Sequence, residues 1–92
     1  MQIDKTIGVI TGGASGLGEA TTRSLCALGA KVAILDIAKE RGEKIAAEVG
    51  ANCLFVKADV TSDAECRAAM EQIMAAFGAI NLAVNCAGVA DP

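Results

Sequence analysis

A glycine-rich stretch near the N-terminus carries the clearest chemical signal in these 92 residues. Residues 11–18 read Thr-Gly-Gly-Ala-Ser-Gly-Leu-Gly and stand between an apolar run and a helical pattern. Gly12, Gly16 and Gly18 let the backbone turn tightly and approach a pyrophosphate, whose charge is attracted by the N–H groups and dipole of a helix N-terminus. The G-x-x-x-G-x-G spacing therefore predicts an anion-binding loop, and a turn that merely needs glycines is the alternative.

A carboxylate follows this loop at the distance expected of a nucleotide-binding site. Asp36 ends the second apolar run 18 residues after Gly18, close to the ~20 expected of a ribose-binding acid. It can accept both hydroxyls of an adenosine ribose, and its charge repels a 2′-phosphate. The neighbouring positions that would neutralise that phosphate, Ser15 and Ile37, are not basic. We therefore expect NAD rather than NADP, with an ordinary helix-capping Asp as the alternative.

Two further segments follow apolar runs and have the residue types of a nucleotide site. Asp59 can accept a hydrogen bond from an adenine amino group while the Val60 backbone meets the ring edge; a turn-forming Asp is the alternative. Residues 85–88, Asn-Cys-Ala-Gly, are small enough to leave room for a cofactor ribose at the sheet edge where ligands bind. A tightly packed strand end explains the same residues without a ligand.

Short apolar runs and longer helical patterns alternate along the chain and would position these residues. Strands are predicted at 7–11, 31–35, 53–56 and 81–85, and helices at 17–28, 38–49 and 62–77. The helices end at Gly29, Gly50 and Gly78, and Ser62 with Glu65 forms a capping box. The inner helix faces are predicted to be Leu17, Thr21, Leu25 and Leu28; then Ile45, Ala46 and Val49; then Cys66, Met70, Ile73 and Phe77.

Strands separated by helices predict a parallel sheet with right-handed crossovers. We expect an α/β fold of the Rossmann type, a doubly wound sheet of order 3-2-1-4 built from the N-terminal βαβαβαβ part. The nearly continuous apolar strands fit a sheet that is buried on both faces.

The four segments, in this order and spacing, resemble the N-terminal half of the short-chain dehydrogenase/reductase family. The resemblance covers nearly the whole chain and is strongest toward members that act on 3-hydroxyacyl-CoA. It implies hydride transfer between a secondary alcohol and NAD, with 3-hydroxyacyl-CoA as the first substrate class and hydroxysteroids as the second. It also implies that Ser15 and Leu17 contact the cofactor, that Cys86 gives a backbone contact and that Asn85 braces the fourth strand. The cofactor-binding residues are then Gly12, Ser15, Gly16, Leu17, Gly18, Asp36, Asp59, Val60, Asn85, Cys86, Ala87 and Gly88.

The catalytic residues that the resemblance implies, a Ser and a Tyr-x-x-x-Lys pair, have no counterpart here. The chain contains no Tyr, so we expect residues 1–92 to be a partial NAD-binding domain that is inactive alone, with the catalytic half beyond Pro92. The resemblance further implies a small-molecule substrate and a homotetramer for the whole enzyme. The alternative is a non-catalytic nucleotide-binding or interaction module that pairs through the exposed edge of its fourth strand.

Composition narrows the partners and the compartment. The net charge is -3 and the eight basic residues are scattered among eleven acids, which disfavours nucleic acid and anionic membranes as partners. No apolar stretch has the length of a bilayer span and the N-terminus lacks a signal-peptide pattern, so we expect a cytoplasmic protein, with a mitochondrial one as the alternative. The four cysteines form no CxxC pair and His is absent, so we expect reduced thiols and no metal site.

Overall fold

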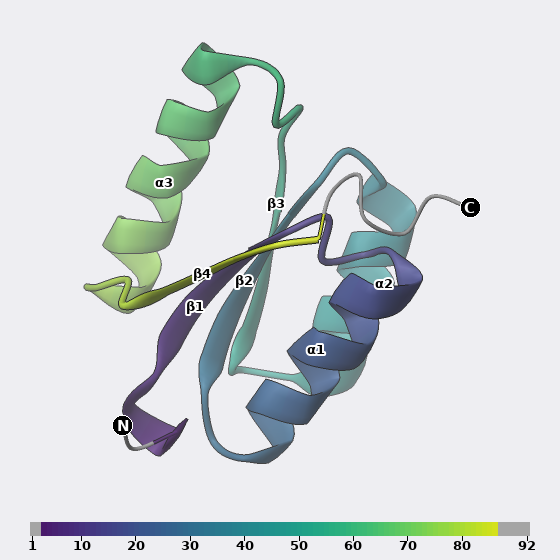
Figure 1. The fold of residues 1–92 in the computed structure, drawn as a ribbon, viewed down its shortest axis with the longest axis vertical. Helices are drawn as coiled ribbons and strands as arrows, with labels where there is room; N and C mark the ends of the chain where they lie inside the picture. The colour runs from purple at the N-terminus through teal and green to yellow at the C-terminus, as the bar shows by residue number, and fades with distance from the viewer. Residues whose placement is uncertain (1–2, 87–92) are drawn as a thin grey trace.

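The computed structural model describes residues 3–86, in which a parallel sheet lies between two layers of helices (Figure 1). The strands are β1 (Ile7–Thr11), β2 (Lys31–Asp36), β3 (Cys53–Lys57) and β4 (Leu82–Asn85). The helices are α1 (Gly16–Ala27), α2 (Lys39–Val49) and α3 (Asp63–Phe77), and a short 3-10 helix, η1 (Ile3–Lys5), precedes β1. The strands are parallel and lie in the order β3-β2-β1-β4, which confirms the expected Rossmann-type α/β fold.

The two faces of the sheet are covered by different helices. Helices α1 and α2 lie on one face and α3 lies on the other (Figure 1). Side chains alternate along β2, so that Ile34 packs with Ile45 of α2, whereas Ala33 and Leu35 pack with Ile73 of α3. After β3 the chain crosses back through α3 to place β4 beside β1, and this reversal creates the switch point at which open α/β sheets bind ligands.

The inner face predicted for the first helix is wrong at Leu17 and Leu28, whereas Leu25 packs against a buried apolar cluster as predicted. Leu17 is 50% exposed and Leu28 is 60% exposed, whereas Gly18 and Thr22 are the buried residues of α1. The reason is the close approach of α1 to the glycine loop. A Cβ on Gly18 would lie 2.1 Å from the Gly12 oxygen, so the helix packs through its glycine and turns its terminal leucines to solvent.

The predicted inner faces of α2 and α3 are confirmed in their main contacts. Ile45 and Ile73 are buried, at 2% and 0% exposure. The second helix also buries Gly42, where a Cβ would lie 2.2 Å from the Phe55 ring, so a glycine again sets the helix-to-sheet distance. No helix within residues 3–86 is long and apolar enough to cross a membrane.

The capping box before α3 forms only in half. The Ser62 hydroxyl accepts a hydrogen bond from the Glu65 N–H at 3.2 Å, as predicted. The Glu65 carboxylate, however, accepts from the Asp59 N–H at 2.9 Å, because the Ser62 N–H already donates to the Asp59 carbonyl. Glu65 therefore closes the whole turn between β3 and α3 and not only the helix end.

Candidate functional site

The hydroxyl of Ser15 holds the glycine loop in shape. It donates to the Gly12 carbonyl at 2.7 Å and accepts from the Gly18 N–H at 3.2 Å. Ser15 is thus the N-cap of α1, and its own N–H donates to the same Gly12 carbonyl. A cap residue with a short hydroxyl side chain explains why Ser suits this position whether or not it also contacts a ligand.

The loop leaves hydrogen-bond donors free at the start of α1. Gly12 has a φ of 71°, in the left-handed region that favours glycine. Within residues 3–86, the backbone N–H groups of Gly16 and Leu17 have no acceptor, as expected for the first turn of a helix. A Cβ on Gly16 would meet no atom within 4 Å, so this side of the loop opens to free space. These donors and this space fit a pyrophosphate.

Asp36 lies beside the loop and is bound to it. Its Oδ2 accepts from the Ala14 N–H at 3.1 Å, and its Oδ1 accepts from the Ala38 N–H at 3.0 Å. A carboxylate has about four acceptor positions, so about two remain for the hydroxyls of a ribose. The Ala38 contact is also what a capping Asp makes, and both interpretations of Asp36 are compatible with the geometry. The Ala14 contact has no signal in the sequence, because it depends on how β1 and β2 pair.

Asp59 is engaged by its own turn. Its Oδ1 accepts from the Thr61 hydroxyl at 2.7 Å and from the Thr61 N–H at 2.9 Å. These two hydrogen bonds hold the pKa of Asp59 below its usual range. The turn-forming role is therefore present, and Oδ2 is the oxygen that remains for a ligand. The neighbouring Val60 side chain is exposed, next to this turn.

The end of β4 is tied to the end of β1. The Thr11 hydroxyl donates to Asn85 Oδ1 at 2.8 Å, and the two residues face each other in the strand register. The Cys86 N–H donates to the Thr11 carbonyl at 2.8 Å, so a Cys86 backbone contact to a ligand falls to its carbonyl. Thr11 was not among the predicted site residues; its signal is that the last residues of two neighbouring strands meet. Ala87 and Gly88 lie outside the described residues.

A groove joins two of the predicted segments. It has a volume of about 440 Å³ and lies at the carboxyl ends of β1 and β4, on the α3 side of the sheet. Its lining residues are Val9, Thr11, Leu35, Val60, Cys66, Met70, Ala83, Val84 and Asn85. The structure thus brings Val60 and Asn85 to one cavity and ties Asp36 to the glycine loop. Within residues 3–86 no group of three or more His, Cys, Asp or Glu is placed to hold a metal ion.

Known proteins are similar to this chain in sequence. A family model described as short chain dehydrogenase matches residues 6–92. The 3-hydroxyacyl-CoA dehydrogenase type-2 of Rattus norvegicus is 48% identical over 84 residues, which cover 91% of this chain and 32% of that protein. The 3-beta-hydroxysteroid dehydrogenase of Comamonas testosteroni is 40% identical, over 94% of this chain and 34% of that protein.

A solved structure is similar to this chain in its fold. The 3-ketoacyl-(acyl-carrier-protein) reductase from Brucella melitensis, complexed with NADH, is 34% identical with a TM-score of 0.86, over 88% of this chain and 34% of that one. The present chain spans about a third of the length of the curated relatives it matches. Because the family match covers nearly all of the sequence and the sheet order agrees, the chain belongs to the short-chain dehydrogenase family.

Proposed function

We propose that this chain binds NAD as part of an oxidoreductase that transfers hydride between a secondary alcohol and NAD. A 3-hydroxyacyl-CoA is the first substrate class and a hydroxysteroid the second, since relatives at 48% and 40% identity carry these names. The observation that carries the cofactor assignment is the Asp36 carboxylate, held beside the glycine loop by the Ala14 N–H at 3.1 Å.

Different residues of the site bind different parts of the cofactor. The free N–H groups of Gly16 and Leu17 bind the pyrophosphate, and Gly12 and Gly18 keep the backbone close enough for this contact. The remaining acceptor positions of Asp36 bind the adenosine ribose. When bound, the nicotinamide ring supplies the group that gives or takes the hydride.

The rest of the site binds the adenine and shapes the far end of the sheet. Oδ2 of Asp59 and the Val60 backbone bind the adenine. Asn85, held by Thr11, fixes the end of β4, where the carbonyl of Cys86 gives a backbone contact to the cofactor. Ala87 and Gly88 are small residue types that leave room for a cofactor ribose. Each of these contacts keeps the cofactor in one orientation along the sheet edge.

The preference for NAD follows from charge. A 2′-phosphate beside Asp36 would place like charges together, with no basic side chain at Ser15 or Ile37 to offset them. The chain contains no Tyr, so a Tyr general acid comes from outside these 92 residues, and we expect the 92 residues alone to be inactive. The whole protein acts on a small molecule as a homo-oligomer, in the cytoplasm or, as the alternative, in mitochondria.

The test compares NAD and NADP binding by calorimetry in the full-length protein that carries this sequence. We expect NAD to bind at least about tenfold more tightly, because like charges about 4 Å apart near a protein surface repel by up to about 4 kcal/mol and about 1.4 kcal/mol already changes affinity tenfold. Asp36→Ala should weaken NAD binding and narrow the difference between the affinities for NAD and NADP. Asp63→Ala, which removes an acid in the first turn of α3, should change neither affinity. Equal binding of both cofactors by the unmodified protein would overturn the assignment.

The second candidate function is an interaction module. In the described part of the chain β4 pairs only with β1, and its other edge has exposed residues at Ala83 and Asn85. A free strand edge can pair with a strand of another chain. Sedimentation of the 92-residue chain with and without NAD separates the two: an NAD-independent dimer that Ala83→Pro abolishes supports the module, and NAD binding by a monomer contradicts it.

A further inference from the structure

Two cysteine thiols lie close together near the amino ends of the strands, whereas the glycine loop lies at the carboxyl end of β1. Cys26 lies in the last turn of α1 and Cys53 opens β3. Cys53 is a buried member of the apolar cluster that includes Ile34 and Ile45, and Cys26 packs against that cluster. The two thiols are close enough for each to influence the pKa of the other. The Cys26 thiol also donates to the Asn52 carbonyl at 3.6 Å. The remaining cysteines, Cys66 and Cys86, lie on α3 and after β4.

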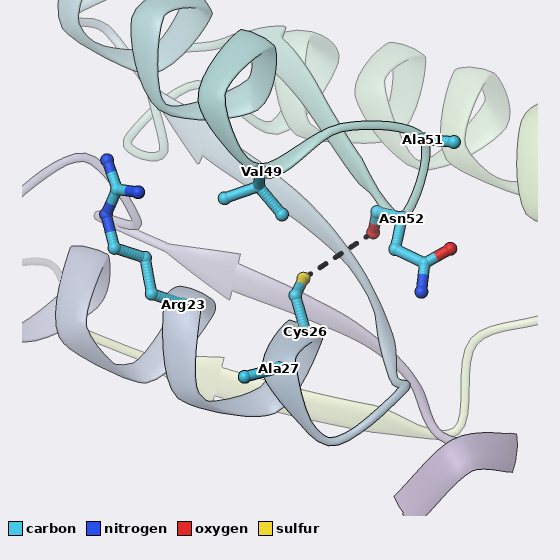
Figure 2. Close-up of a pocket in the computed structure, with 6 residues that line it drawn as sticks. All are labelled: Arg23, Cys26, Ala27, Val49, Ala51 and Asn52. Carbon is cyan, nitrogen blue, oxygen red and sulfur yellow. Dashed lines mark hydrogen bonds between the residues drawn. The ribbon is translucent and has the colours of Figure 1, made fainter.

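The two thiols differ in their access to solvent. A pocket of about 340 Å³ is lined by Arg23, Cys26, Ala27, Val49, Ala51 and Asn52. In Figure 2 the Cys26 sulfur points into the space between α1, the end of α2 at Val49 and the turn that carries Asn52. Cys53 is buried and is not among the lining residues. The pair therefore has an accessible member and a sheltered member.

The backbones that carry the two thiols are fixed by hydrogen bonds. The Cys26 carbonyl accepts from the Gly29 N–H at 3.0 Å, and the Cys53 N–H donates to the Gly50 carbonyl at 3.0 Å. The Asn52 carbonyl accepts from the Val32 N–H at 2.8 Å, which anchors the turn to β2. The contact between the thiols thus belongs to the fold and does not depend on a mobile loop.

We propose that Cys26 and Cys53 are a modification site, which a low-molecular-weight disulfide such as oxidised glutathione converts to an intramolecular disulfide. The Cys26 sulfur, as thiolate, attacks one sulfur of the small disulfide, forms a mixed disulfide and releases one small thiol. The Cys53 sulfur then attacks the Cys26 sulfur, the protein disulfide forms, and the second small thiol leaves. Each cysteine gives up one proton, each departing thiolate takes one, and the small disulfide is reduced by the two electrons that the cysteines lose.

The protonation of the two thiols agrees with this order. Burial raises the pKa of Cys26, and a hydrogen bond with Cys53 works in the opposite direction. Burial raises the pKa of Cys53 to about 12, and the neighbouring Cys26 thiolate adds to the shift. Cys26 is therefore the first nucleophile, and its capture as a mixed disulfide removes the charge that disfavours the Cys53 thiolate. Because only thiolates react, the reaction should quicken as the pH rises.

The experiment treats the full-length protein with oxidised glutathione at mildly alkaline pH and maps its disulfides by digestion and mass spectrometry. We expect Cys26–Cys53 to be the predominant pair. The same reaction in concentrated guanidinium is the control, because an unfolded chain closes short loops more readily. There Cys53 and Cys66, 13 residues apart, should pair more often than Cys26 and Cys53, 27 residues apart.

Two variants sharpen the result. Cys26→Ser should abolish the disulfide and leave Cys53 as a free thiol, whereas Cys66→Ser should leave the disulfide unchanged. Oxidation should raise the Tm by about 5–10 °C in the unmodified protein and not in Cys26→Ser. The proposal fails if the folded protein gives the same pairs as the unfolded chain, or if Cys26 stays a mixed disulfide with glutathione while Cys53 remains free.

Discussion

The strands β2 and β4 flank β1 on opposite sides, and different forces hold them there. In β2 the four residues from Val32 to Leu35 are at most 2% exposed, so apolar packing on both faces fixes the strand. In β4 half-buried and exposed residues alternate. Its ends are instead bound by polar side chains, Asn81 to the backbone of Ile7 and Lys5, and Asn85 to Thr11.

This difference assigns different tasks to the two halves of the site. The carboxylate on β2, Asp36, stands on a strand that is rigid through burial. Asn85 on β4 depends on two hydrogen-bonded ends, because little apolar area fixes its register. Substitutions in the packed region should therefore cost much stability, and substitutions in the hydrogen-bonded region should cost little but affect the geometry of the site.

The largest effect is expected for Ile34→Ala in β2. Ile34 is fully buried and packs with Ala14, Ile45 and Cys53, so the substitution leaves a cavity beneath the glycine loop. We expect a loss of about 4 kcal/mol in the free energy of unfolding, measured in urea. Val84→Ala in β4 is the matched control and should cost about 1 kcal/mol, since Val84 is only half-buried. Similar losses for the two would contradict the distinction between the strands.

The next effect concerns the contact between α1 and the glycine loop that follows β1. Gly18→Ala places a Cβ 2.1 Å from the Gly12 oxygen, so the helix must move away from the loop. We expect a loss of about 2–3 kcal/mol, together with weaker NAD binding. Gly16→Ala should be neutral or stabilising by up to about 1 kcal/mol, because its Cβ meets nothing within 4 Å. If Gly18→Ala were as stable as Gly16→Ala, the close packing would not be what positions α1.

The comparison also separates what sequence can predict from what it cannot. The bounds of β1 and the strand order follow from apolar runs, glycines and the crossover rule, which are local or general. The inner face of α1 was predicted from its leucines and was wrong at Leu17 and Leu28, because the approach of Gly18 to a backbone oxygen outweighs the burial of these two leucines. Such a distance is a property of the packed molecule and leaves no periodicity to find.

The site shows the same division. That Asp36 would lie near the loop could be predicted from its place at the end of β2. Its contact with Ala14 could not, because the donor is a backbone N–H, which every residue except Pro carries. Glu65 was expected at the Ser62 N–H and binds the Asp59 N–H, since the turn between them folds back. Thr11 pairs with Asn85 because their strands are neighbours in register, which topology gives and residue type alone does not.

A smaller effect is expected for Asn81→Ala, directly before β4. The side chain accepts from the Ile7 N–H at 2.8 Å and donates to the Lys5 carbonyl at 3.0 Å. Because Asn81 is exposed, water replaces part of these bonds, and we expect a loss of about 1 kcal/mol. Asn81→Asp keeps the acceptor and loses the donor. Its free energy of unfolding in urea should therefore lie between those of the unmodified protein and of Asn81→Ala. Faster amide hydrogen exchange in β4 than in β2 should accompany the loss.

The smallest effect is a pH dependence at the turn between β3 and α3. The Thr61 hydroxyl and then its N–H hold the pKa of Asp59 below its ordinary value of 3.8. A depressed pKa in the folded state means that the ionised carboxylate stabilises the fold above the unfolded pKa. This stability is lost as the pH falls below about 4 and through the folded pKa.

Thr61→Val removes the hydroxyl and keeps the N–H, so part of this dependence should disappear. The unfolding free energies of the two proteins should differ near neutral pH and converge below about pH 4. Thr21→Val is the control, because the Thr21 hydroxyl donates to the Leu17 carbonyl, which does not titrate. Its difference from the unmodified protein should be the same at every pH. A difference that stays constant for Thr61→Val as well would show that the Asp59 turn is held by its backbone bonds alone, and that this pH dependence does not come from the Thr61 hydroxyl.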